Sequence, residues 1–130
     1  MFSDNQLNIA NDREIQAFSE SEYLLRVKPL VDIYETEDEM IVRLEMPGVG
    51  KENLQVQIKD GYLHISGRRN NSKVPGQYLL RETRDVLFER IFELEDNLDT
   101  QKITANYRYG ILTITIGKKE EAKPRTIKIN

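Results

Sequence analysis

Few side chains in this sequence are of the types that carry out catalysis. His64 is the only histidine and cysteine is absent, so there is no thiolate nucleophile and no histidine or cysteine metal cluster. His64, beside Ser66 on a predicted strand face, is interpreted as a solvated surface residue. The carboxylates of Glu37, Asp38 and Glu39 lie in a predicted turn, whereas acid–base catalysis needs two carboxylates in a cleft with separated pKa values. We therefore predict a protein that is not an enzyme and has no metal or cofactor.

The residues best suited to recognition are two isoleucines near the end of the chain. Ile127 and Ile129 lie in a charged tail that contains Pro124 and has no core of its own. In an extended segment residues i and i+2 point to the same side, so the pair presents an apolar plug. Full burial of one isoleucine contributes about 1.5–3 kcal/mol before ordering costs. We predict that this end docks into a groove, either on its own domain or on a neighbouring copy.

Arg90 is a charged residue within an apolar pattern. Alternation along a strand places it on the same face as Phe88, Phe92 and Leu94. A charge on such a face needs an ion-pair partner or an interface. The alternative is a strand-edge arginine whose guanidinium reaches water. We favour the interface.

These residues belong to a region of short predicted strands between residues 29 and 118. The alternating segments, in chain order, are 31–35, 40–46, 54–58, 63–66, 86–94, 103–107 and 111–116. Turn signals separate them, including the hairpin turn pair Asp60-Gly61, which tolerates positive φ, and a Tyr109-Gly110 corner. Short alternating strands with little helical periodicity predict an all-β fold, an immunoglobulin-like β-sandwich of two antiparallel sheets.

The segments that flank the strands are polar. Residues 1–28 carry scattered apolar side chains without a sustained amphipathic stripe, and are either an arm ordered by partners or an ordinary disordered leader. Residues 119–130 form a charged, extended tail. We therefore divide the chain into an N-terminal arm (1–28), a sandwich domain (29–118) and a C-terminal extension (119–130).

A long loop interrupts the sandwich between residues 67 and 88. Its first half is polar, and a short strand-like piece with three apolar residues follows at 78–82. A loop of this length in a small sandwich is uncommon and usually functional. The apolar piece either joins a partner subunit's sheet edge, giving a dimer by strand exchange, or folds back on its own sheet.

The composition limits the kinds of partner. With 130 residues the chain is long enough for one domain. A net charge of −3 with a sequence pI near 5.3 argues against nucleic-acid binding. No apolar run approaches the roughly 20 residues that span a bilayer, so no stable membrane insertion is expected. The N-terminus does not read as a secretory signal, and we expect a cytoplasmic protein.

Four segments in a fixed order resemble a known family. They are residues 31–49 with their Pro-Gly turn, Phe88-Glu89-Arg90 (F-x-R), Ala105 to Leu112 (A-x-x-x-x-G-x-L) and Ile127-Lys128-Ile129 (I-x-I). Over about residues 29–129 the chain resembles the small heat shock proteins, built on the α-crystallin domain, of the bacterial and plant-like type.

The resemblance implies an ATP-independent holdase, a chaperone that binds partly unfolded proteins and prevents their aggregation. It also implies a homo-oligomer of dimers, with ATP-dependent chaperones acting downstream. The alternative is a p23-like co-chaperone or another β-sandwich binding module, which would not be expected to carry both the long loop and the I-x-I tail.

The resemblance and the strand pattern together assign candidate site residues. The groove that receives Ile127 and Ile129, and binds clients when free, would consist of Leu54, Val56, Ile58, Ile103 and Ala105. The strand-exchange dimer interface would contain Val31, Ile33, Tyr78, Leu79, Leu80, Arg81, Glu82 and Arg90. Client-binding candidates in the arm are Phe2, Leu7, Ile9, Ile15 and Phe18.

Overall fold

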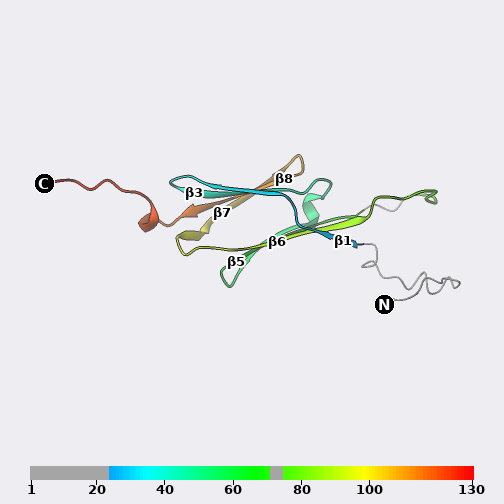
Figure 1. Ribbon diagram of the computed structural model, residues 1–130, viewed down its shortest axis with the longest axis horizontal. Helices are drawn as coiled ribbons and strands as arrows, with labels where there is room; N and C mark the ends of the chain where they lie inside the picture. The colour runs from blue at the N-terminus through cyan, green and yellow to red at the C-terminus, as the bar shows by residue number, and fades with distance from the viewer. Residues whose placement is uncertain (1–23, 71–74) are drawn as a thin grey trace.

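Two four-stranded sheets stacked face to face make up the fold in the computed structural model, which describes residues 24–70 and 75–130 (Figure 1). The first sheet has the order β1 (Leu24–Val27), β6 (Asp85–Glu93), β5 (Tyr62–Arg69), β4 (Leu54–Lys59). The second has the order β2 (Val31–Glu35), β3 (Glu39–Glu45), β8 (Ile111–Lys118), β7 (Leu98–Arg108). Two single-turn 3-10 helices, η1 (Lys51–Asn53) and η2 (Glu120–Ala122), precede β4 and follow β8. The predicted β-sandwich is confirmed.

The strand pairing is antiparallel with one exception. β1 runs parallel to β6, with Leu24 opposite Asp85 and Val27 opposite Phe88. Residues 24–27 thus form a strand within the stretch assigned to the N-terminal arm, and Val27 packs against the core. The sandwich therefore begins a few residues earlier than the sequence pattern indicated.

Two tight turns set the register of the β4–β5 and β7–β8 hairpins. Asp60 and Gly61 have φ of 54° and 81°, and Tyr109 and Gly110 have φ of 54° and 75°. Positive φ at both central residues is the hairpin turn whose twist matches that of the strands. A side chain at Gly110 would also bring a Cβ to 3.1 Å from the Cα of Pro47. The predicted hairpin turn at Asp60-Gly61 is confirmed, and the predicted corner at Tyr109-Gly110 is a second hairpin turn.

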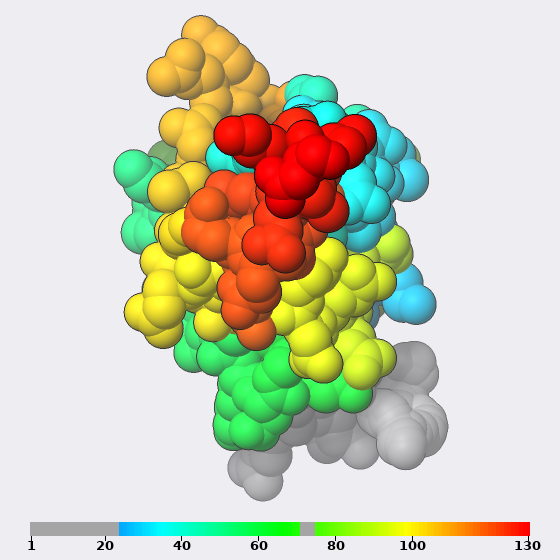
Figure 2. All heavy atoms as spheres, turned by 90° about the vertical axis from the view of Figure 1, so that its left-hand side faces the viewer, coloured from blue at the N-terminus to red at the C-terminus, as the bar shows by residue number. Residues whose placement is uncertain are grey.

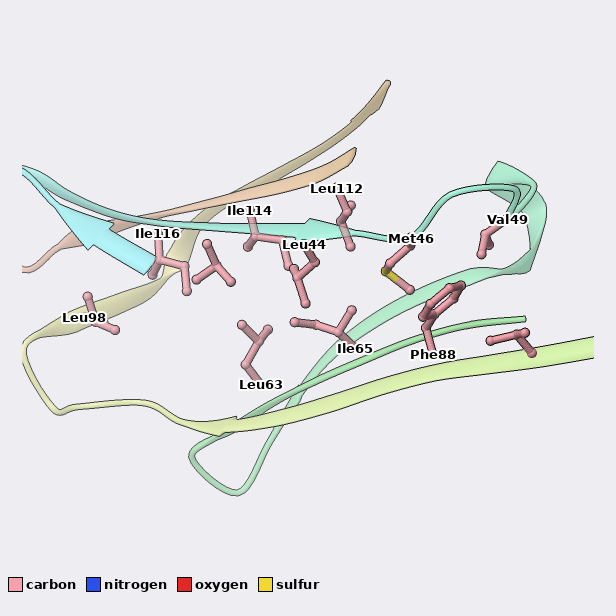
Figure 3. Close-up of a cluster of buried hydrophobic side chains, with 12 residues drawn as sticks. Leu44, Met46, Val49, Leu63, Ile65, Phe88, Leu98, Leu112, Ile114 and Ile116 are labelled. Carbon is pink, nitrogen blue, oxygen red and sulfur yellow. The ribbon is translucent and has the colours of Figure 1, made fainter. Parts of the chain in front are cut away.

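The core lies between the facing sides of the two sheets (Figure 3). Alternate residues of each strand point inward, so Val42 and Leu44 of β3 and Ile114 of β8 are fully buried. The opposite sheet contributes Leu63 and Ile65 of β5, each at most 1% exposed. Each of these strands thus has one buried face, as the alternation of its sequence requires.

Candidate functional site

The sandwich is open along the side where β4 and β7 lie. β4 is the last strand of one sheet and β7 the last strand of the other, and neither has a neighbour on its outer side. Between them runs a groove of about 400 Å³. The groove is lined by Val56, Gln57, Ile58, Thr100, Ile103, Thr104 and Ala105. We call this surface the edge groove.

Four of the five predicted groove residues line the edge groove: Val56, Ile58, Ile103 and Ala105. Leu54, the fifth, does not line it. Its Cδ2 would lie 2.9 Å from a Cβ placed on the buried Gly67, so Leu54 packs toward the core at the start of β4. Alternation places Leu54 on the correct face but does not show how far along β4 the groove extends.

Three polar residues of the edge groove were not predicted: Gln57, Thr100 and Thr104. Strict alternation assigns Gln57 to the outer face of β4. Thr100 lies in an irregularity of β7 between Asp99 and Ile103, where the pairing with β8 shifts register. A bulge of this kind re-aims side chains at a sheet edge, and a β-bulge leaves little signal in the sequence.

None of the residues that line the edge groove is ionisable. Its walls are aliphatic side chains with a few hydroxyl and amide groups at the rim. An uncharged, mostly apolar concavity with a few polar groups suits an apolar side chain on an extended segment. The same surface offers no general acid or base for catalysis.

The two isoleucines of the tail are exposed. Ile127 is 76% exposed and Ile129 is 91% exposed, and residues 123–130 form no strand or helix. Figure 1 shows the tail leaving one end of the sandwich and extending away from it, and Figure 2 shows it in front of the sandwich when viewed from that end. Within the described residues, therefore, Ile127 and Ile129 do not occupy the edge groove of their own subunit.

The opposite side of the sandwich, where β2 and β1 are the last strands of their sheets, is open as well beside β2 and the part of β6 that does not pair with β1. Ile33 points inward from β2 yet is 47% exposed, because β2 has no strand beyond it. A hollow beside β6 is lined by Lys28, Glu89, Arg90, Ile91 and Phe92. We call this side the β2 seam. It contains the predicted interface residues Val31, Ile33 and Arg90.

Arg90 lies on the inward face of β6, opposite Ile65 of β5. Its guanidinium is 5.4 Å from the centroid of the Phe92 ring. Within residues 24–70 and 75–130 no carboxylate lies within ion-pair distance of it. The aromatic contact compensates only part of the cost of holding a charge on this face.

A smaller hollow of about 240 Å³ continues the β2 seam toward the turn before β7. Its lining includes Tyr34, Asn97 and Leu98, which sequence reasoning missed. The Oδ1 atom of Asn97 is buried without a hydrogen-bond partner in the described part of the chain. Nothing in the local sequence marks this turn, because its burial depends on the chain passing from one sheet to the other.

Residues 75–84 form no strand in the isolated subunit, in contrast to the strand-like piece expected at 78–82. Leu79 is 98% exposed and Leu80 is 76% exposed. The guanidinium carbon of Arg81 lies 5.0 Å from the centroid of the Tyr78 ring. The guanidinium also forms an ion pair with Asp85, with 3.2 Å between nitrogen and oxygen. A strand needs a hydrogen-bonding neighbour, and this segment extends from the sandwich without one (Figure 1).

The remaining predictions concern residues away from these surfaces. The arm candidates Phe2, Leu7, Ile9, Ile15 and Phe18 lie outside the described residues. His64 is half-buried on β5, and no three His, Asp or Glu side chains in residues 24–70 and 75–130 are arranged to hold a metal ion. The two described helices are three residues long, far too short to cross a membrane.

Comparison with known sequences gives a consistent result. Residues 32–130 match the model of the Hsp20/alpha crystallin family. Small heat shock protein C4 of Rickettsia felis is 37% identical over 106 residues, which cover 80% of this chain and 65% of that protein. The probable 15 kDa heat shock protein of Leptospira interrogans is 32% identical over 124 residues, which cover 93% of each.

Solved structures of similar proteins have the same fold. Heat shock protein 16.0 from Schizosaccharomyces pombe is 35% identical, with a TM-score of 0.61 over 80% of this chain and 96% of that one. A small heat-shock protein from Xylella fastidiosa, described as having a distinct high order structure, is 30% identical with a TM-score of 0.59. It matches 80% of this chain and 97% of its own.

Proposed function

The chain belongs to the Hsp20/alpha crystallin family, whose membership implies a chaperone role, and from that premise we propose that it is an ATP-independent holdase. In this proposal it binds partly unfolded proteins, prevents their aggregation and works as a homo-oligomer of dimers. The observation that carries the proposal is the pairing of an uncharged apolar groove with an exposed isoleucine plug on the same chain.

The edge groove and the tail together provide a reversible link between subunits. Ile127 and Ile129 of one subunit enter the edge groove of another, where Val56, Ile58 and Ile103 receive them. Burial of two isoleucines contributes about 3–6 kcal/mol, from which the cost of ordering the tail is subtracted. A link of this strength opens and closes readily, and many such links in one particle give a stable assembly.

The β2 seam provides the dimer interface in this proposal. Residues 78–82 of one subunit add as a strand to the free edge of β2 in its partner, which covers Val31 and Ile33. The exposure of Leu79 and Leu80 supports this, because such side chains gain most from a partner surface. An acidic side chain of the partner then pairs with Arg90.

Clients bind by the same apolar chemistry. When a tail leaves the edge groove, the exposed aliphatic wall becomes available to an extended apolar segment of an unfolding protein. The arm residues Phe2, Leu7, Ile9, Ile15 and Phe18 are further client-binding candidates. Clients would later pass to ATP-dependent chaperones.

An aggregation assay tests the proposal. A thermolabile client is heated with the purified protein in the absence of ATP, and light scattering by aggregates is recorded. We expect suppression at a few subunits per client. The variant carrying Ile127→Ala and Ile129→Ala should still bind client, because its edge groove is no longer masked, whereas Lys128→Ala should behave as the unmodified chain. Aggregation that proceeds unchanged with all three proteins would refute the holdase function.

A further inference from the structure

Four charged side chains hold the start of the C-terminal extension. Lys123 Nζ lies 2.7 Å from Glu120 Oε2 and 3.8 Å from Asp38 Oδ1. Lys102 Nζ lies 3.4 Å from the same Glu120 oxygen. These residues come from η2 and the residue after it, from the turn between β2 and β3, and from β7. We call the four residues the tail anchor.

Backbone hydrogen bonds extend along the chain as far as the tail anchor. The N–H of Lys118 donates to the carbonyl of Asp38 at 2.8 Å, and that of Lys119 donates to Asn97 at 2.9 Å. The N–H of Lys123 donates to Glu120 at 3.2 Å. Pro124 has no N–H to continue this pattern. The hinge of the tail is therefore at Lys123 and Pro124, directly after the anchor.

The contacts within the anchor shift the pKa values of Glu120 and Lys123. Hydrogen bonds and charge interactions with Lys123 and Lys102 lower the pKa of Glu120. The hydrogen bond to Glu120 raises the pKa of Lys123, together with the charges of Glu120 and Asp38. Both shifts favour the charged forms, so the anchor responds to ionic strength rather than to a change of pH around 7.

The anchor lies close to the subunit's own edge groove. Lys102 and Lys123 line a hollow on one side of β7, and this hollow shares Ile103 and Thr104 with the edge groove. Ile127 lies four positions after Lys123, a reach of roughly 13–14 Å when extended. Neighbouring strands are about 4.8 Å apart, so a released tail is long enough to cross the single edge strand β7. The tail is thus long enough to dock in the edge groove of its own subunit, yet it extends away from the sandwich (Figure 1).

We propose that the tail anchor directs the tail outward and thereby selects docking on a neighbouring copy over self-docking. The inference deepens the proposed function and rests on it. With the anchor intact, Asp38 and Glu120 hold Lys123 on the β3 side of β7, away from β4. Without the anchor, the hinge turns freely and the tail occupies the edge groove of its own subunit. Docking within one subunit is then favoured, because it is an intramolecular contact. Subunit links are then lost while the groove stays filled.

Disulfide trapping tests the direction of docking, since the chain has no cysteine of its own. Gln57→Cys in the groove and Lys128→Cys between the isoleucines give one pair per subunit. After oxidation, links between subunits run as a ladder on a non-reducing gel, whereas self-links keep the mass of one chain. The pair is introduced into three backgrounds: the unmodified anchor, Glu120→Gln, and Glu121→Gln as the matched control. Glu121 lies in the same η2 turn and forms no ion pair with a described residue.

We expect the ratio of inter-subunit to self-links to fall about threefold with Glu120→Gln and to stay unchanged with Glu121→Gln. Raising the salt concentration should lower the ratio more in the unmodified background than in Glu120→Gln, where only the Lys123–Asp38 pair remains. Equal ladders in all three backgrounds would overturn the inference while leaving tail docking intact. No disulfide in any background would refute docking itself, and with it the proposed assembly.

Discussion

The two open sides of the sandwich differ in charge although both expose inward-facing aliphatic residues. No ionisable side chain lines the edge groove, whereas Lys28, Glu89 and Arg90 line the hollow of the β2 seam. An uncharged groove can be filled and emptied without separating charges. A charged seam favours only a partner that supplies matching charges in the correct geometry. From this difference we expect reversible contacts at the edge groove and a specific, lasting contact at the β2 seam.

Removal of the loop should have the largest effect on this comparison. Deletion of residues 76–84 removes the segment that would add to β2, and we expect particles to fall apart into single subunits. Static light scattering measures the mass, and far-UV circular dichroism shows whether the sandwich remains folded. A folded variant that still forms stable dimers would place the dimer interface elsewhere.

Loss of the plug should have the next largest effect. Ile127→Ala with Ile129→Ala removes about 3 kcal/mol or more of burial from each link, which weakens it by over a hundredfold. We expect large assemblies to become dimers, since the β2 seam is untouched. Lys128→Ala is the control, and light scattering is again the measurement. If the double variant kept the mass of the unmodified protein, the tail would not link subunits.

Arg90→Ala tests the charged seam directly. Removal of a charge that pairs across an interface costs about 1.5–3 kcal/mol, so the dimer dissociation constant should rise at least tenfold. Arg43 lies on the outer face of β3 opposite Asp32, and Arg43→Ala serves as the control. Analytical ultracentrifugation measures the dimer dissociation constants, on variants that lack the C-terminal tail so that only dimers form. Equal constants for the two variants would make Arg90 an ordinary edge arginine.

The smallest effect is expected from pH. The pKa of Glu120 is lowered, so the contribution of its ion pairs is present above its ordinary value and is lost as pH falls through the lowered one. The pKa of Lys123 is raised, so its contribution is lost only as pH rises through that raised value. Asp38 and Lys102 are the charged groups that face them. Particle mass should therefore be constant between about pH 6 and 9, and a step within that range would point to another titrating group.

The sequence was sufficient for most of the sandwich. Alternation predicted the strands β3, β5 and β8, because one side of each strand is buried and the side-chain period is two. The hairpin turn at Asp60-Gly61 was recognisable because few residue pairs tolerate positive φ, whereas Tyr109-Gly110 was predicted only as a corner.

Other features depend on contacts between distant segments. Residues 24–27 have too little alternation to mark a strand, and the partner of β1 lies about sixty positions away. Gln57 reaches the groove because of its position at a sheet edge, which local pattern does not reveal. The tail anchor joins Asp38 to Lys123, and no sequence spacing indicates such a contact.

The parallel pairing of β1 with β6 has a kinetic consequence. A strand of four residues that closes a loop of about sixty pays a large entropy cost for a small number of hydrogen bonds. It should be the last strand to join during folding and the first to separate in the native state. Amide hydrogens of residues 24–27 should then exchange with solvent faster than those of β5, even though β1 belongs to the same sheet. Each separation briefly replaces the edge strand β1 by the longer strand β6, so a second set of backbone hydrogen-bonding groups becomes available on this side of the first sheet.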